Sequence, residues 1–158
     1  MTRFLFVALL GWTSSTVATA ADPKKMEWTV GDVKREALVY IPEKADKEAA
    51  PVVFAFHGHG GTMKYAATKF AYHKQWPEAI CVYMQGLNTV SKTDPKGEKP
   101  GWQNIAGSNE DRDLKFFDDV IKATRHGRSL SVCNAVLPCG NAMRFHRKGT
   151  QNGYDHEI

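Results

Sequence analysis

Residues 51–61 read PVVFAFHGHGG, and this stretch decides the fold class. Residues 52–56 are apolar at every position, which is typical of a strand buried on both faces in a parallel sheet. Such a short run followed at once by glycines is too short for a buried helix. Glycine allows a sharp turn and a close approach of the backbone to a ligand. We therefore predict a buried strand that runs into a functional loop.

The segments around this stretch predict an α/β fold. Residues 79–86, AICVYMQG, form a second apolar run that ends in glycine. Between the two runs, residues 62–76 place apolar side chains at helical spacing, and Pro77 closes the segment. Strand, helix and strand in this order predict a βαβ unit. Two short β-prone runs, 27–30 and 37–41, predict an opening antiparallel hairpin.

The next part of the chain predicts a long surface loop and then a helix. Residues 87–110 are rich in proline and glycine and have no period, and a loop of this length is often functional. Ser108 or Asn109 is the expected N-cap of the helix that follows. The helix is expected to have one apolar stripe, with most charged side chains outside it: Leu114, Phe117, Val120 and Ile121 on the stripe, and Asp113, Lys115, Asp118 and Lys122 mostly off it.

The first twenty residues have the layout of a secretory signal peptide. Arg3 precedes the apolar run 4–12, and small residues lead to Ala20, after which we expect cleavage. The apolar run is far shorter than the roughly 20 residues that span a bilayer, so no membrane span is expected. The mature protein is therefore predicted to be secreted or periplasmic, with one small domain over residues 21–124.

The periodic pattern stops after Thr124, and residues 125–158 read as an irregular basic tail. Residues 120–158 hold 6 Lys and Arg against 2 Asp and Glu. The formal net charge of the whole chain is only +4, which gives no reason to expect a nucleic-acid partner. Of the three cysteines, Cys133 and Cys139 lie in the tail, and Cys81 is predicted to be a buried small hydrophobic residue.

The HGHGG segment at residues 57–61 admits three interpretations. His57 and His59 are a possible pair of metal ligands, although a zinc site needs three or four ligands and no carboxylate lies at a telling spacing. The two histidines are alternatively plain turn residues. In the third interpretation the backbone N–H groups bind a developing negative charge, and this one requires glycine.

Four features together resemble one family of secreted enzymes, over about residues 26–123. They resemble the N-terminal part of the α/β-hydrolases grouped as polyhydroxybutyrate depolymerases and feruloyl esterase-like enzymes. The features are the VYIP strand at 39–42, the HGHGG segment at 57–61, the YMQG strand end at 83–86, and GWQ at 101–103 ahead of DRD at 111–113.

The resemblance implies the N-terminal portion of an α/β-hydrolase fold with an incomplete sheet, an ester or polyester substrate, and no cofactor. It implies that the N–H of His59 or Gly60 is an oxyanion donor and that His57 supports the loop. Trp102 would line the substrate cleft or, alternatively, anchor a loop. The implied site residues are His57, Gly58, His59, Gly60 and Gly61 in the oxyanion-hole loop, and Trp102 and Gln103 in the cleft.

The sequence departs from this family at the nucleophile. Such enzymes carry a Gly-x-Ser-x-Gly elbow on the strand after this helix, and no such motif occurs here. Ser129 follows Gly127-Arg128, but Ser131 stands where the motif needs its second glycine. Ser131 has no glycine two residues away on either side, and Cys139 lacks the preceding Gly-x. We therefore expect a truncation or frameshift after about residue 124 and no esterase activity from this chain. The alternative functions are a small secreted carbohydrate- or phenolic-binding protein and a metal-dependent hydrolase that uses His57 and His59.

Overall fold

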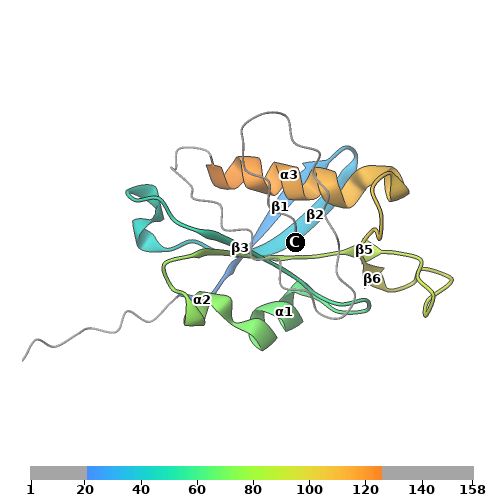
Figure 1. Cartoon of the computed structure of the whole chain (residues 1–158), viewed down its shortest axis with the longest axis horizontal. Coiled ribbons are helices and arrows are strands. Elements are labelled where there is room, and N and C mark those ends of the chain that lie inside the picture. The colour runs from blue at the N-terminus through green and yellow to red at the C-terminus, as the bar shows by residue number, and fades with distance from the viewer. Residues whose placement is uncertain (1–20, 126–158) are drawn as a thin grey trace, which may run out of the picture.

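The computed structural model describes residues 21–125 (Figure 1). The expected signal peptide, the tail from residue 126 onward, and Cys133 and Cys139 lie outside the described residues. The described elements follow in the order β1 (Lys24–Val30), β2 (Val33–Tyr40), η1 (Glu43–Asp46), β3 (Val52–Phe56), α1 (Met63–Phe70), α2 (Tyr72–Gln75), β4 (Ile80–Met84), β5 (Leu87–Asn88), β6 (Pro100–Gly101), η2 (Ser108–Asp111) and α3 (Arg112–Arg125).

The main sheet has four strands in the order β1-β2-β4-β3. β1 and β2 form the predicted antiparallel hairpin, which turns at Gly31 with a φ of 60°. β2 pairs with β4 in the antiparallel direction, and β3 pairs with β4 in parallel, from Val52 opposite Ile80 to Phe56 opposite Met84. The mixed α/β architecture is thus confirmed, and the carboxyl ends of β3 and β4 lie side by side.

Helices cover both faces of this sheet. Figure 1 shows α3 on one side and α1 and α2 on the other. Every residue of β3 and of β4 is buried, as the unbroken apolar runs predicted. One core cluster joins the sheet to Phe116 and Val120 of α3, and the other joins it to Met63 and Ala66 of α1. Burying a large apolar side chain contributes about 1.5–3 kcal/mol, so these two clusters hold the layers together.

The single helix expected over residues 62–76 is wrong, because the structure breaks it at Ala71. Ala71 has a φ of 47°, and its N–H donates to Ala67 O at 3.1 Å, which ends α1 with a left-handed cap. After the break, His73 turns into the core, where its backbone N and its Nδ1 lie 3.2 and 2.8 Å from the Tyr83 hydroxyl. This buried contact accounts for the change of direction.

The expected N-cap at Ser108 or Asn109 is also wrong. α3 begins at Arg112, and Asn109, Glu110 and Asp111 all have positive φ, between 49° and 55°. The Ser108 hydroxyl donates to Ile105 O at 2.7 Å instead of capping the helix. The sequence pattern did not show that three consecutive residues adopt this left-handed conformation.

Asp113 was predicted to lie off the buried face of α3, and this too is wrong. Asp113 is 2% exposed, because it pairs with a buried arginine on β2, as described below. Phe116 is fully buried, although it was not assigned to the apolar stripe, whereas Phe117 and Ile121 pack only partly against the core.

The loop over residues 87–110 has more structure than its composition suggested. β5 and β6 pair antiparallel, with Leu87 opposite Gly101 and Asn88 opposite Pro100, and Ser91 bridges to Asp94. Residues 87–101 therefore form a hairpin beside the end of the main sheet. Within residues 21–125, no helix combines the length and the apolar character that a membrane span requires.

Candidate functional site

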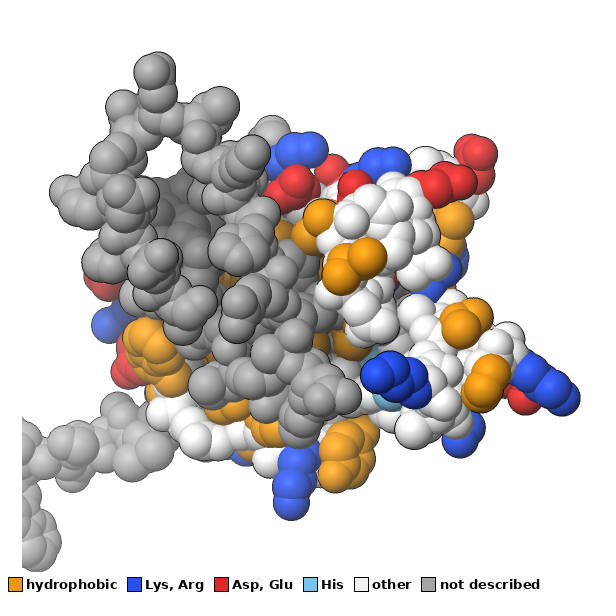
Figure 2. Space-filling view, turned by 45° about the vertical axis from the view of Figure 1, so that its right-hand side comes forward, with side chains coloured by type: hydrophobic (Ala, Val, Ile, Leu, Met, Phe, Trp, Pro, Cys, Tyr) orange, Lys and Arg blue, Asp and Glu red, His pale blue; other side chains and the backbone are white. Residues whose placement is uncertain are grey.

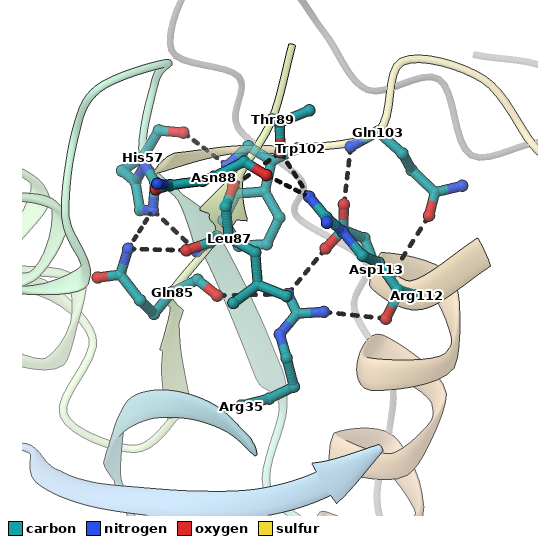
Figure 3. Close-up of polar contacts among 11 residues, drawn as sticks. Arg35, His57, Gln85, Leu87, Asn88, Thr89, Trp102, Gln103, Arg112 and Asp113 are labelled. Atoms are coloured by element: carbon teal, nitrogen blue, oxygen red, sulfur yellow. Dashed lines mark hydrogen bonds and ion pairs between the residues drawn. The ribbon is translucent and has the colours of Figure 1, made fainter. Parts of the chain in front are cut away.

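The candidate site is the loop between β3 and α1, which lies at the carboxyl ends of β3 and β4. Residues 101–103 follow the hairpin and lie against this loop. Figure 3 shows His57, Gln85 and Trp102 approaching one another from three separate segments. In open α/β sheets this end of the parallel strands is the usual place for ligands.

His57 is a structural support of the loop, and its contacts define its protonation state. The side chain is buried, and its Nε2 accepts a hydrogen bond from the Gly86 N–H at 3.0 Å. Nδ1 therefore carries the proton and donates to Gly58 O at 2.8 Å. Burial lowers the pKa of His57 below 6.5, against a smaller opposing effect of the Gly58 hydrogen bond. With both ring nitrogens engaged, neutral His57 holds two backbone segments together.

The glycines that follow His57 form a tight turn. Gly61 N–H donates to Gly58 O at 2.9 Å, and Gly60, with a φ of 77°, occupies the position that requires positive φ in a type II turn. A Cβ at Gly61 would lie 2.9 Å from Gly58 O and 3.0 Å from the His57 Cβ. Glycine is thus required at residue 60 for its conformation and at residue 61 for space.

The backbone donors of this turn are not equally available. Gly60 N–H donates to Pro100 O at 2.7 Å, and Gly61 N–H is used within the turn. Within residues 21–125, the N–H groups of Gly58 and His59 donate to no protein acceptor. Of the two oxyanion donors suggested by the sequence, His59 and Gly60, only His59 has an uncommitted N–H.

His59, Asp94 and Ser91 come together beside the turn, but not as a catalytic relay. His59 Nε2 lies 3.2 Å from Asp94 Oδ2 and 3.3 Å from Ser91 Oγ. A Ser-His-Asp relay needs the carboxylate on Nδ1 and the hydroxyl on Nε2, whereas both groups here contact the same nitrogen. Because a carboxylate only accepts, Nε2 donates to Asp94 and is not free to take a proton from Ser91.

Asp94 is an ionised acceptor in the segment that joins β5 to β6. Burial alone would raise its pKa, but hydrogen bonds from the backbone N–H groups of Lys99 and Glu98 and from His59 lower the pKa of Asp94 below 3.8. The Lys99 N–H donates to Asp94 Oδ2 at 2.9 Å. The carboxylate therefore fixes the hairpin and contacts the glycine turn at the same time.

Trp102 makes the contacts of a loop anchor. Its indole N–H donates to His57 O at 2.8 Å, and its ring packs edge-on against Phe56 with 5.0 Å between the centroids. The side chain is half-buried, which leaves part of the ring open to solvent. These are the contacts of a loop anchor. Within residues 21–125, no contact of Trp102 outlines a substrate cleft.

Gln103 was expected to line the substrate cleft, but its side chain is turned inward. It is 4% exposed, its Nε2 donates to Asp111 Oδ1 at 2.9 Å, and its Oε1 accepts from the Asp113 N–H at 3.0 Å. The Gln103 N–H also donates to Asp113 Oδ2 at 2.7 Å. Since these groups are engaged with the start of α3, Gln103 holds the loop to the helix and is not open to a substrate.

Sequence reasoning missed three residues that organise this site. Arg35 reaches from β2 to Asp113 Oδ1 at 2.7 Å and to Arg112 O at 3.0 Å. Gln85 Oε1 accepts from the Met63 N–H at 3.0 Å and so connects the end of β4 to the start of α1. Arg35 stands between two other charged residues, Lys34 and Glu36, so no local pattern singled it out.

Gly86 is the third missed residue, and glycine is required there because a side chain has no room. A Cβ at Gly86 would lie 2.3 Å from Gly101 O, so no side chain fits between β4 and β6. The sequence showed a glycine at the end of the strand, but it did not show that Gly101, fifteen positions further on, would lie against it.

A shallow hollow of about 320 Å³ lies next to the hairpin, and its lining carries no charged residue. It is lined by Thr89, Val90, Asn104, Ile105, Ser108 and Asn109. Val90 and Ile105 are 63% and 71% exposed, the highest values among the exposed large apolar side chains of the described chain. Figure 2 shows separate apolar side chains with basic ones between them on the right of that view, and no single continuous patch there.

The metal interpretation of His57 and His59 finds little support in the geometry. Both ring nitrogens of His57 are engaged with the backbone, and His59 Nε2 contacts Asp94. In the described part of the chain, no three His, Cys, Asp or Glu side chains lie close enough to hold a metal ion.

Comparison of the chain with known protein families and with curated proteins found no match.

Proposed function

We propose that residues 21–125 form the oxyanion-binding part of a secreted carboxylic-ester hydrolase of the α/β-hydrolase type. The uncommitted N–H of His59 carries this proposal. It lies in a glycine turn that leaves β3 and enters α1. In α/β-hydrolases the strand-to-helix loop at this position contributes one N–H to the oxyanion hole.

The chemistry of ester hydrolysis explains why such an N–H matters. When a nucleophile attacks the ester carbonyl, negative charge develops on its oxygen, and a fixed donor stabilises that charge. Loss of one donor typically costs about 100- to 1000-fold in rate. Glycines support this role because they let the turn form without a side chain over the donor, and the engaged Gly60 N–H holds the turn in place.

The second donor and the nucleophile of such a site normally come from a Gly-x-Ser-x-Gly segment, which this sequence does not contain. We therefore propose that the chain as given does not hydrolyse esters by itself. The purified protein is expected to hydrolyse p-nitrophenyl acetate no faster than buffer does. A rate well above buffer that disappears in the His59→Pro variant would show a complete site and contradict this proposal.

The link to the esterase family has a separate test in the gene. We propose that the coding sequence beyond codon 124 is in a shifted reading frame relative to the family. Sequencing of the locus is expected to show a Gly-x-Ser-x-Gly segment in another reading frame downstream. If none of the three frames encodes one, the shifted-frame explanation is wrong.

A small secreted binding protein is the second candidate function, and the uncharged hollow near Val90 and Ile105 favours it. A volume of about 320 Å³ falls at the lower end of the range for small-molecule sites. Calorimetric titration with neutral sugars and with hydroxycinnamates tests this candidate. Heat of binding without product formation would support it, and the absence of binding by both classes would count against it.

A further inference from the structure

Glycines stand on both sides of His59, so the position of this residue depends on the contacts that hold the turn. Gly58 and Gly60 flank His59, and glycine gives little resistance to rotation of the adjoining peptides. The Gly60 N–H is held by Pro100 O, and the peptide that carries the His59 N–H is held at its carbonyl, because Gly58 O accepts from the Gly61 N–H at 2.9 Å and from His57 Nδ1 at 2.8 Å. The His59 side chain provides a further attachment near the proposed oxyanion donor, one that reaches a different segment of the chain.

The imidazole of His59 is confined from two sides. On one side, Nε2 lies 3.2 Å from Asp94 Oδ2, in a carboxylate whose side chain is only 9% exposed. On the other side, the ring packs directly on Gly101, where an added Cβ would lie 2.6 Å from Nδ1 and 3.2 Å from Cε1. No side chain fits between His59 and the backbone of β6. The ring is thus held between a carboxylate and a glycine.

Asp94 is itself held firmly enough to act as an anchor. Its carboxylate accepts the Lys99 N–H, and its own N–H donates to Ser91 Oγ at 3.1 Å and to Ser91 O at 3.2 Å. These bonds close the hairpin over residues 91–99. Because the carboxylate only accepts, it selects the form of His59 that carries its proton on Nε2.

We propose that Asp94 is a positioning residue for the oxyanion donor. It keeps the His59 imidazole in the Nε2-protonated form against Gly101, and through the side chain it adds to the hydrogen bonds at Gly58 O that hold the peptide with the uncommitted N–H. Asp94 contacts no substrate in this arrangement, and it acts only through His59. The inference rests on the oxyanion role proposed above for the His59 N–H.

Nuclear magnetic resonance of the full ¹⁵N-labelled chain tests the positioning directly. At pH 8, the imidazole nitrogens of His59 are expected to show protonated Nε2 and bare Nδ1. Asp94→Ala is expected to convert this signature into an average of both tautomers. Asp94→Asn is expected to keep it in part, because the amide oxygen still accepts. A wild-type His59 protonated on Nδ1, or an unchanged tautomer in Asp94→Ala, would overturn the proposal.

Two control variants separate the tautomer effect from damage to the hairpin. Ser91→Ala removes the second contact of Nε2, and Gly97→Ala strains the hairpin, since Gly97 has a φ of 66° and a Cβ there would lie 3.0 Å from Val90. Both variants keep the Asp94 carboxylate and are expected to keep the tautomer. Loss of the tautomer in Gly97→Ala as well as in Asp94→Ala would assign the effect to the hairpin and contradict the proposal.

A titration with acetate connects the positioning to the proposed oxyanion role. Acetate is expected to shift the amide resonance of His59 in the wild type. In Asp94→Ala the affinity is expected to fall about 5-fold, the factor that corresponds to about one hydrogen bond. If acetate leaves the wild-type amide unmoved, the oxyanion role loses its support, and the imidazole tautomer alone then decides whether Asp94 positions His59.

Discussion

Arg35 on β2 and Asp113 on α3 form an ion pair with 2.7 Å between Nη2 and Oδ1, and each side chain is 1% exposed. The same carboxylate accepts the N–H of Gln103, so the pair also holds the loop that carries Trp102. Through the bond from Trp102 to His57, this contact reaches the candidate site. A single buried pair therefore joins the sheet, the last described helix and the glycine turn.

Removal of Arg35 is expected to destabilise the protein strongly. Arg35→Met leaves the Asp113 carboxylate buried without its partner, which typically costs about 3–5 kcal/mol in the free energy of unfolding. Urea unfolding followed by circular dichroism measures the loss. The double variant Arg35→Met/Asp113→Leu removes both charges and should recover part of it. The exposed pair Lys25–Glu36 is the matched control, and Lys25→Met should leave the midpoint unchanged.

Trp102→Phe tests whether Trp102 anchors the loop. Phenylalanine keeps an aromatic ring against Phe56 but loses the donor to His57 O. The free energy of unfolding is expected to fall by about 1 kcal/mol, and amide exchange at Gly60 should become faster. Trp76 is exposed and gives the control, because Trp76→Phe should change neither quantity. An equal effect of both substitutions would show that the His57 contact adds no stability.

Gly86→Ala is expected to separate the two sheets. The added Cβ would lie 2.3 Å from Gly101 O, and a backbone oxygen cannot move away without breaking the pairing of β5 with β6. Such overpacking typically costs about 1–3 kcal/mol. Gly107→Asn measures backbone strain without a steric clash, since Gly107 has a φ of 84° but open space around an added Cβ, and it should cost less than Gly86→Ala. A wild-type unfolding midpoint in Gly86→Ala would contradict the close approach of Gly86 to Gly101.

The stability of the protein is expected to fall when the pH decreases below neutrality. Burial lowers the pKa of His57 and of His73 below 6.5. The folded state then binds fewer protons than the unfolded state, so stability is lost as the pH falls through 6.5 toward the lowered pKa values. The urea midpoint at pH 5.5 should therefore lie below that at pH 7.5. His73→Phe should reduce this difference, and an unchanged difference would exclude His73 as a contributor.

Cys81 is expected to be unreactive in the folded protein. It is completely buried on β4, and burial raises the pKa of its thiol to about 12, so the reactive thiolate is scarce at neutral pH. Iodoacetamide followed by peptide mass spectrometry should modify Cys81 only when urea approaches the unfolding midpoint. Fast modification in the absence of urea would show that β4 opens in the native state.

Much of the fold was predictable because local patterns follow directly from burial. The unbroken apolar runs of β3 and β4 predicted two strands covered on both faces, and the two β-prone runs at 27–30 and 37–41 predicted the opening hairpin. The break at Ala71 was not predictable, because it depends on a contact between His73 and Tyr83, ten residues apart in the chain. The burial of Asp113 was not predictable for the same reason, because its partner Arg35 lies far away in the sequence.

The candidate site, like the fold, was predictable from the sequence only in part. The sequence suggested the glycine loop and proposed the N–H of His59 or Gly60 as donor, with Trp102 as either a cleft residue or an anchor. Only the tertiary structure showed that Pro100 occupies the Gly60 N–H and that Trp102 contacts His57 O. The inward orientation of Gln103 was likewise invisible in the sequence, because it follows from bonds to Asp111 and Asp113.

The sequence by itself determined the strands of the main sheet and the need for glycine after β3, because these depend on residues close to one another in the chain. Within residues 21–125, the tertiary structure decided which N–H groups of the glycine turn are engaged and which side chains contact the turn. Hydrogen-bond donors are taken up by acceptors from segments such as residues 94–102, and only the folded backbone brings those segments to the glycine turn.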